Sequence, residues 1–403
     1  RQLTIQDVYD VQAAVRAGEA DERELENVIR HACPGAGGCG IAASFNTWGL
    51  AMEVLGLMPP QSSSNPAEGD EKRDECLSAG KWMASILDRN IRPLDVISRD
   101  SLANATAMIG SVGGSTNGIL HLLALAREAG VPFDLRDMQA ILRKTPVYCN
   151  FAPRGNGTMI DLFEMGGASM LIRHLISAGV LDGATPTLFS GSLAEQVADA
   201  ADWSPRQDLV APIDSPFKSY ADIQVCFGSL APEGIVFKVS SRQQPVFEGT
   251  AICFSDVASL ENAVIQGEVR AGHVVVLRGM GPAAMGMPEV LVATAALSSP
   301  ALDGKVALVS DARISGVSHG AIGVHCSPEA AAGGAIGQIS DGDPVSFDLL
   351  AGEINWKGKG GGSTRYGSYR GEAVYLREFC DNVTQAHMGC VSRQVGHSSG
   401  ADG

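Results

Sequence analysis

One cysteine stands in a setting that could give its sulfur chemistry. Cys39 ends the glycine-rich run Cys33–Cys39, shortly before Ser44–Leu55, which the sequence predicts to be a helix. Backbone N–H groups in such a turn favour a thiolate and can donate hydrogen bonds to the sulfides of an iron–sulfur cluster. A buried structural thiol fits the same residues, so the spacing alone leaves both interpretations open.

The same run matches the G-x-G-x-x-G pattern of nucleotide sites at Gly35–Gly40. A dinucleotide-binding turn needs a β-strand before these glycines, whereas the preceding Glu22–Arg30 is acidic and helical in pattern. The sequence also lacks a G-K-[ST] triplet, which excludes a P-loop. We therefore predict no nucleotide site here.

Two predicted helix starts could bind charged ligands. Ser115 and Thr116 follow two glycines and can cap a helix over Ile119–Glu128, whose free N–H groups suit an anionic substrate group. Glu289 follows Pro288 at another predicted helix start, as a ligand for a hard metal ion or as a charge that complements the helix dipole. An ordinary helix end remains the alternative at both places.

Ser315 lies shortly after a predicted strand that begins at Lys305. Reactive groups of α/β enzymes are commonly found at the carboxyl ends of strands. Asp311 and His319 are near it in sequence, but the G-x-S-x-G turn is missing and all three residues fall on one short loop. We therefore reject a Ser-His-Asp triad and expect His319 and His325 to be hydrogen-bonding loop residues.

The residue pattern changes over about residues 200–222. Helical patterns dominate before it, as at Asp21–His31 and Ala168–Ser177, and short β-rich runs between turn residues dominate after it. We predict an α/β protein with a helical α/β domain over residues 1–205, packed on a β-barrel-like domain over residues 206–403. Within the second domain, Trp356–Gly371 is typical of a flexible loop or an imperfect junction. The predicted strands are Ile223–Phe227, Ile235–Val239, Ala251–Phe254, His273–Leu277, Lys305–Val309 and Pro344–Leu349, with helices at Leu260–Gln266 and Pro288–Ala296.

Charge and composition exclude several classes of partner. The 403 residues carry 30 Lys and Arg against 45 Asp and Glu, a net charge of −15, and no basic run would follow a nucleic acid. The longest apolar stretches are shorter than the roughly 20 residues of a membrane span. Nine sparse cysteines favour free thiols in a reducing, intracellular compartment. Residues 1–30 show no signal or transit segment, so we expect any such segment to have been removed or to lie outside this sequence.

Taken in order, the motifs resemble the dihydroxy-acid dehydratase and sugar-acid dehydratase family. The resemblance covers about residues 1–350, and the ending His387–Ser392 is also similar to the family's C-terminus. The residues that carry it are Ala32–Cys39 (ACPGAGGC), Ser62–Ala67 (SSSNPA), Gly113–Gly130 (GGSTNGILHLLALAREAG), Gly228–Lys238 (GSLAPEGIVFK), Phe247–Thr250 (FEGT), Gly286–Glu289 (GMPE), Asp311–Gly316 (DARISG) and Ser327–Gly334 (SPEAAAGG).

The resemblance implies a hydro-lyase that is a homodimer or tetramer, with an α/β domain and a barrel-like domain. Such enzymes convert a 2,3-dihydroxy acid to a 2-keto acid with an iron–sulfur cluster, [2Fe–2S] or [4Fe–4S], and Mg²⁺. Carried over by position, Cys39 is similar to a cluster ligand, Glu289 to the Mg²⁺ carboxylate and Ser315 to the base. The resemblance also implies that the substrate binds at Ser115, Thr116 and Arg313.

Within the family, the chain looks closer to the enzymes of branched-chain amino-acid synthesis. This reading rests on Ser318–Gly320, His325 and Pro328–Ala330, and on the few polar side chains in these loops. The implied substrates are 2,3-dihydroxy-isovalerate and 2,3-dihydroxy-3-methylvalerate, in the cytoplasm of a bacterium or the mitochondrial matrix of a eukaryote. A pentonate or hexonate dehydratase is the alternative, as is a catalytically weak paralogue with a binding role.

The sequence departs from the family pattern at several places. The family carries well over a hundred residues ahead of the position of Arg1, with two more cluster cysteines, acidic Mg²⁺ ligands and a carbamylated lysine. We expect these to belong to a longer protein. Gly40–Trp48 replaces a Thr-Ala-Asn-Thr-Met run, Ala312 replaces a glycine, and Ala283–Met285 replaces a glycine-rich stretch. We expect the larger side chains to narrow the substrate channel.

Overall fold

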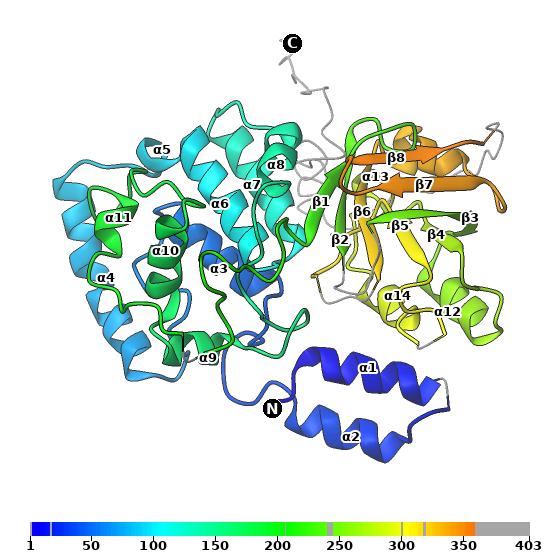
Figure 1. Cartoon of the computed structure of the whole chain (residues 1–403), viewed down its shortest axis with the longest axis horizontal. Coiled ribbons are helices and arrows are strands. Elements are labelled where there is room, and N and C mark those ends of the chain that lie inside the picture. Colours follow the sequence, from blue (N-terminus) through cyan, green and yellow to red (C-terminus); the bar gives the residue numbers. More distant parts are fainter. Residues whose placement is uncertain are drawn as a thin grey trace, which may run out of the picture.

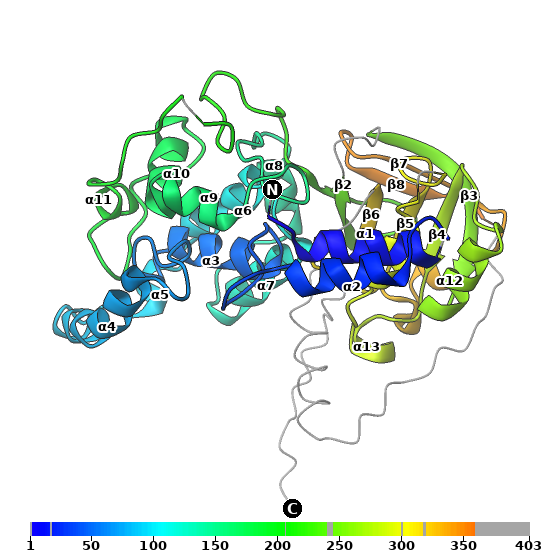
Figure 2. The same ribbon diagram turned by 90° about the horizontal axis from the view of Figure 1, so that it is seen from below.

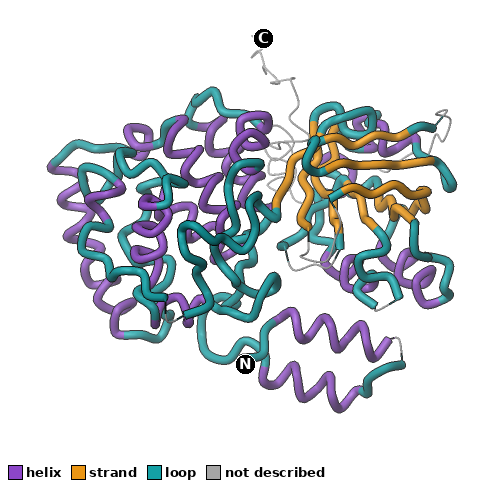
Figure 3. Tube along the Cα trace, in the orientation of Figure 1, coloured by secondary structure: helices purple, strands orange, loops and turns teal. Residues whose placement is uncertain are grey.

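Helices form the first half of the chain and a β-sheet dominates the second half. The computed structural model describes residues 2–16, 18–205, 207–239, 245–299, 301–316 and 320–358. The two regions lie side by side, which confirms the predicted mixed α/β class with a barrel-like second region (Figures 1 and 3). The predicted loop Trp356–Gly371, beyond its first three residues, and the motif His387–Ser392 lie outside the described residues.

Local capping residues start the helices that the sequence predicts. The Asp21 carboxylate accepts the backbone N–H of Glu24 at 2.8 Å at the start of α2 (Glu22–His31). The Ser115 hydroxyl accepts the N–H of Asn117 at 3.2 Å at the start of α7 (Thr116–Glu128). The other helices of this region are α1 (Ile5–Arg16), α3 (Ser44–Val54), α4 (Asp70–Asp88), α5 (Pro93–Val96), α6 (Arg99–Ser111), α8 (Leu135–Leu142), α9 (Met159–Glu164), α10 (Gly167–Ser177) and α11 (Leu193–Gln196).

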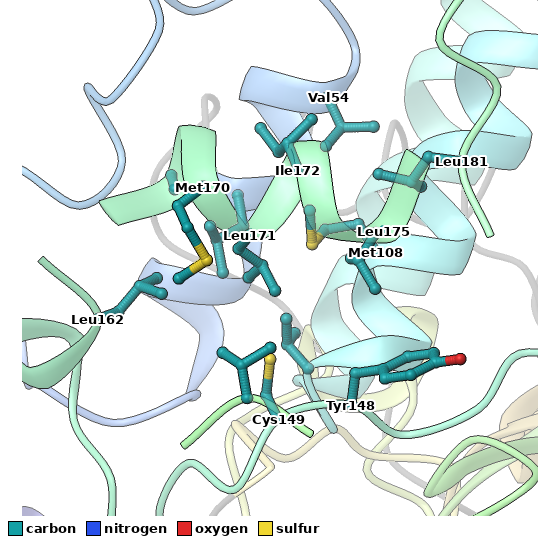
Figure 4. Packing of buried hydrophobic residues seen from close by; sticks show 14 of the residues in the cluster. Val54, Met108, Tyr148, Cys149, Leu162, Met170, Leu171, Ile172, Leu175 and Leu181 are labelled. Carbon is teal, nitrogen blue, oxygen red and sulfur yellow. The ribbon is translucent and has the colours of Figure 1, made fainter. Parts of the chain in front are cut away.

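Helix α10 lies in the centre of one apolar core of the helical region. Its fully buried Leu171 and Leu175 pack with Met108 of α6 and with Cys149, as Figure 4 shows. A second core joins the helical region to the sheet, because Leu122 of α7 packs in one cluster with residues of the first two strands. The two regions therefore share apolar packing, and burial of this surface holds them together.

The strands form one eight-stranded sheet that nearly closes on itself. Its order is β1-β2-β6-β5-β4-β3-β7-β8, with parallel pairing from β3 through β4 and β5 to β6 and antiparallel pairing elsewhere. The N–H of Phe227 donates to Gly352 O, and the N–H of Ile354 donates to Phe227 O, both at 3.0 Å. This bridge joins the two outer strands. The strands are β1 (Ile223–Cys226), β2 (Gly234–Val239), β3 (Val246–Phe254), β4 (His273–Leu277), β5 (Ala307–Ser310), β6 (Ala321–Ser327), β7 (Pro344–Asp348) and β8 (Glu353–Trp356).

Short helices and an N-terminal hairpin cover the outside of the barrel. Helix α12 (Val257–Ile265) and helix α14 (Leu291–Ala296) pack apolar side chains on the central strands, and α13 (Pro282–Met285) precedes α14. The hairpin of α1 and α2 extends below the barrel (Figures 1 and 2), where Arg16 pairs with Glu261 of α12. The first segment of the chain thus contacts the barrel directly.

The structure differs from the sequence predictions in a few elements. Strand β6, at the centre of the barrel, was not predicted, and it contains His325, which is fully buried. The expectation that His325 lies in a loop is therefore wrong. The helix predicted from Pro288 begins only at Leu291, because Glu289 pairs with Arg313 in an isolated β-bridge.

Candidate active site

Cys39 ends an irregular turn that depends on glycine. The backbone angle φ is +90° at Gly35 and +105° at Gly37, a region that other residues rarely adopt. Asn46 Nδ2 donates to the carbonyl oxygen of Cys39 at 2.6 Å and so joins the turn to the start of α3. Burial, with a smaller contribution from nearby Cys33, raises the pKa of the Cys39 thiol. A thiolate at this position therefore needs a bound cation to stabilise it.

A cavity of about 740 Å³ opens beside this turn. Both Cys33 and Cys39 contribute to its wall, together with the serine-rich turn Ser62–Asn65. Trp48 and His121 complete an aromatic side, where their rings meet edge to face with centroids 5.2 Å apart. The cavity is large enough for a small organic acid.

Two carboxylates hold the serine-rich wall of the cavity. Glu53 of α3 is fully buried, and it accepts the N–H of Gln61 at 2.8 Å and the hydroxyl of Ser63 at 2.6 Å. Burial raises the pKa of Glu53 to about 7, although these hydrogen bonds oppose the shift. Glu75 holds the other side of the turn and accepts Asn65 Nδ2 at 3.1 Å. The wall is thus fixed from both sides.

The starts of α3 and α7 meet through hydroxyl groups. Ser44 Oγ and Ser115 Oγ lie 3.2 Å apart, and Asn117 Nδ2 donates to Ser44 Oγ at 2.8 Å. The N–H of Ser115 donates to Thr47 Oγ1 at 3.0 Å. The helix that follows the Cys39 turn is therefore joined to the helix that Ser115 caps.

A buried carboxylate anchors the barrel loop that leads to Ser315. Asp311 is fully buried, and its two oxygens accept the backbone N–H groups of Gly279 at 3.1 Å, Met280 at 3.0 Å and Ala330 at 3.0 Å. Burial raises the pKa of Asp311, and these three N–H groups oppose that shift. The Asp311 carboxylate is therefore used to join its own loop to the backbone at Gly279, Met280 and Ala330. His319, the other member of the rejected triad, lies outside the described residues.

Glu289, Arg313 and Ser315 lie together in this loop region. Glu289 Oε1 accepts the backbone N–H of Ser315 at 2.8 Å, and Glu289 Oε2 lies 3.5 Å from Arg313 Nη1. Arg313 Nε donates to the carbonyl of Met287 at 3.0 Å. Burial raises the pKa of Glu289 to about 7, against the opposing charge of Arg313. A further positive charge beside Glu289 would favour its ionised form.

The barrel loop rests directly on the start of α7. Thr116 Oγ1 donates to the carbonyl of Ile314 at 3.1 Å. A Cβ atom at Gly316, where φ is +97°, would lie 3.1 Å from Ser115 Cα, so a larger residue would be strained and crowded there. Five of the six residues predicted at the site therefore come together, and Cys39 is connected to them through α3. Those five are Ser115, Thr116, Glu289, Arg313 and Ser315.

Sequence reasoning missed two residues on the same face of α7. Asn117 is buried, and its Oδ1 has no hydrogen-bond partner. His121 follows one turn later, and burial and the charge of Arg313 lower its pKa. The i, i+4 spacing of these two side chains, directly after the Ser115 cap, was the available signal.

Comparison of the chain with known proteins shows which family it belongs to. The N-terminal family model of the dihydroxy-acid/6-phosphogluconate dehydratases matches residues 1–196, and the C-terminal model matches residues 208–390. The chain belongs to this family. It is 38% identical over 358 residues to a dihydroxy-acid dehydratase of Bradyrhizobium diazoefficiens, which covers 89% of this chain and 62% of that protein.

Other dihydroxy-acid dehydratases have similar sequence identity to this chain. A dihydroxy-acid dehydratase of Francisella tularensis subsp. novicida is 36% identical over 397 residues, covering 97% of this chain and 71% of that protein. A mitochondrial dihydroxy-acid dehydratase of Aspergillus fumigatus is 40% identical over 336 residues, covering 82% of this chain and 55% of that protein. The chain thus spans less than two thirds of the length of some of these dehydratases. None of the helices described here is long and apolar enough to cross a membrane.

In the described part of this chain, only a few side chains could serve as metal ligands. Within it, no three His, Cys, Asp or Glu side chains gather as a metal site. The Glu289 carboxylate and the unpartnered, buried Oδ1 of Asn117 are oxygen atoms of the kind that Mg²⁺ prefers. Asn117 also lowers the pKa of Glu289, which places the two side chains close together. Cys39 faces a cavity and fits one thiolate ligand of a cluster.

Proposed function

We propose that this chain belongs to a hydro-lyase that removes water from a 2,3-dihydroxy carboxylic acid and gives a 2-keto acid. The observation that supports this most is the contact of the barrel loop with the start of α7. There Glu289 holds the backbone of Ser315, and Thr116 holds that of Ile314. A serine, a carboxylate and a helix N-terminus thus lie in one place, and we assign to them the proton acceptor and the anion site that this elimination requires.

In the proposed reaction Ser315 removes the proton from C2 of the substrate. The Ser315 side chain is half-buried, and Arg313 beside it keeps about 39% of its side chain exposed. The guanidinium pairs with the substrate carboxylate and favours an ionised serine nearby. Loss of the C3 hydroxide then gives an enol, which tautomerises to the 2-keto acid. Ser115 and Thr116 are fully buried, and their hydroxyls shape the helix start.

Two cofactors belong to the proposal. Glu289 with Asn117 would hold part of a Mg²⁺ site, and Cys39 would be one ligand of a [2Fe–2S] or [4Fe–4S] cluster. When bound, these centres act as Lewis acids that acidify the C2 proton and assist departure of the hydroxide. The assembly is a homodimer, located in the bacterial cytoplasm or the mitochondrial matrix.

The proposed substrate is a short, branched 2,3-dihydroxy acid, as in valine and isoleucine synthesis. Phe45, Trp48 and Met58 supply apolar surface to the cavity wall. The hydroxyls of Ser62 and Ser63 donate to Glu75 and Glu53 and are thus already used within the protein. We expect the extra hydroxyls of a sugar acid to find few partners on this side of the cavity, at about 1–3 kcal/mol for each one buried without a hydrogen bond.

Turnover on two substrates tests the proposal. The intact protein, reconstituted anaerobically with iron, sulfide and Mg²⁺, is assayed for 2-keto acid from 2,3-dihydroxy-isovalerate and from xylonate. We expect a visible absorption band from the cluster and a higher kcat/KM on the branched acid. A higher kcat/KM on xylonate would assign the sugar-acid reaction instead. Absence of turnover on both acids, with the cluster present, would refute the dehydratase.

A further inference from the structure

We propose that Lys238 is a positioning residue for the dehydration. It holds the Gly113–Gly114 turn from the barrel side and so sets where the start of α7 lies against the loop of Ser315. This inference rests on the proposed function, because that function places the reaction between these two segments.

Lys238 reaches from the barrel into the helical region. It lies in β2, and only 4% of the residue is exposed. Its ammonium group donates to the carbonyl oxygens of both Gly113 and Gly114, the latter at 2.7 Å. This turn lies between the end of α6 and the start of α7, so one side chain of the barrel contacts the connection of the two helices.

These bonds fix the orientation of two peptide groups. The peptide that carries Gly113 O also carries the N–H of Gly114, which donates to Ile109 O at 3.0 Å. The peptide that carries Gly114 O also carries the N–H of Ser115, which donates to Thr47 Oγ1 at 3.0 Å. Lys238 therefore holds one side of each peptide plane while the helical region holds the other side.

The turn has little space in which to move. A Cβ atom at Gly113, where φ is +59°, would lie 3.2 Å from Asp222 Oδ2. A Cβ atom at Gly114 would lie 2.6 Å from Thr47 Cγ2. The turn therefore packs closely against Asp222 and Thr47, and a small change in the direction of its carbonyls would disturb these contacts.

The barrel contacts this short segment at a second point. Thr116 Oγ1 donates to the carbonyl of Ile314, and Gly316 packs against Ser115. Lys238 and the loop of Ser315 belong to the same barrel, so they act as two fixed points on one helix start. Without the Lys238 contact, the bond from Thr116 to Ile314 is the remaining hydrogen bond described here between the barrel and this helix start.

The charge of Lys238 depends on a small buried group of ions. Asp222 is almost fully buried and pairs with Arg154 at 2.9 Å and with Lys218 at 3.0 Å. Burial lowers the pKa of Lys238 to about 8; Asp222 opposes this shift, and Arg154 and Lys218 add to it. Above this pH the neutral amine keeps its N–H groups but makes weaker bonds to the two carbonyls.

Lys218 provides a matched control for the test. It lies in the same ion group and carries the same charge, but its ammonium group donates to Asp222 Oδ1 at 3.0 Å and not to the turn. We compare Lys238→Met with Lys218→Met in the intact, reconstituted protein by measuring kcat/KM on 2,3-dihydroxy-isovalerate from pH 6.5 to pH 9.5. Hydrogen–deuterium exchange of residues 115–117 is followed in the same samples.

For Lys238→Met we expect kcat/KM to fall roughly 10- to 100-fold. The decline of the wild-type rate above pH 8 should be absent, and amide exchange at residues 115–117 should be at least about tenfold faster. Lys218→Met should stay within about twofold of the wild type in kcat/KM below pH 8 and in amide exchange. Its decline in rate should remain but move to higher pH, because Lys218 helps to lower the pKa of Lys238. Equal behaviour of the two variants, or an unchanged pH profile in Lys238→Met, would reduce Lys238 to a structural contact and overturn the proposal.

A second measurement needs neither a variant nor activity. In the wild-type protein, exchange of residues 115–117, corrected for the intrinsic pH dependence, should rise between pH 7 and pH 9. Flat corrected exchange would refute the positioning role even if Lys238→Met fails to fold. A rise in exchange without turnover on either acid would keep the positioning role and refute the proposed reaction instead.

Discussion

Replacing Glu53 by glutamine should change how the stability of the protein depends on pH. Glu53 is fully buried beneath the serine-rich wall of the cavity, where it accepts hydrogen bonds from Gln61 and Ser63. Burial raises its pKa from 4.5 to about 7. Between these two values the folded protein keeps a proton that the unfolded chain has lost.

The size of the effect follows from this difference in pKa. A raised carboxyl pKa means that the contribution of Glu53 to stability is fully present below pH 4.5 and is lost as pH rises through about 7. The full shift corresponds to about 3 kcal/mol, and most of it falls between pH 5 and pH 8. Glutamine has no proton to lose in this range. The free energy of unfolding of Glu53→Gln should therefore rise relative to the wild type, by roughly 2–3 kcal/mol, from pH 5 to pH 8.

Urea unfolding of the wild type and Glu53→Gln at pH 5 and pH 8 measures this change. Glu75→Gln is the control, because Glu75 holds the same turn from the other side and its pKa is lowered. The contribution of Glu75 is present above pH 4.5 and is lost only at lower pH, so its variant should show little change between pH 5 and pH 8. If the difference between Glu53→Gln and the wild type is the same at both pH values, the buried carboxylate does not carry the raised pKa.

Three further predictions concern the site. Cys39→Ser should lower the iron and sulfide content and abolish turnover. Cys76→Ser, at an exposed cysteine, should keep the cluster content and the turnover of the wild type. Equal iron content in the two variants would contradict a cluster at Cys39. Glu289→Gln should raise the Mg²⁺ concentration needed for half the maximal rate, and an unchanged requirement would return Glu289 to a structural role. Ser315→Ala should keep the fold and the cluster but lower kcat by about 10²–10⁴-fold. It should also stop exchange of the C2 hydrogen of the substrate with deuterium from the solvent. Turnover within a few-fold of the wild type would mean that another group is the base.

The fold was predictable where the signal is local. The caps at Asp21 and Ser115 start helices because a side-chain oxygen satisfies a free N–H of the first turn. Strand β6 was missed because Ala321–Ser327 has no alternation of polar and apolar residues, being buried on both faces between β2 and β5. The start of α14 was misplaced because the bridge between Glu289 and Arg313 is a contact over a long sequence separation.

The candidate site was predictable in its residues but not in its connections. Motif similarity identified Ser115, Glu289 and Ser315, yet nothing in their spacing shows that the barrel loop lies on the start of α7. The buried Lys238 reads as an ordinary strand residue, since only the packing of the two regions shows which carbonyls it contacts. The domain bounds at residues 205 and 206 stay predictions.

The bridge between Phe227 and Glu353 has a consequence for how copies of this chain can associate. Open sheet edges present unpaired N–H and C=O groups that recruit strands from other molecules. Here the two outer strands, β1 and β8, have four residues each and are tied to one another. Over the described residues, the sheet therefore offers no long free edge for strand addition. Two copies would meet through side chains of helices and loops, and the barrel region should resist edge-to-edge aggregation.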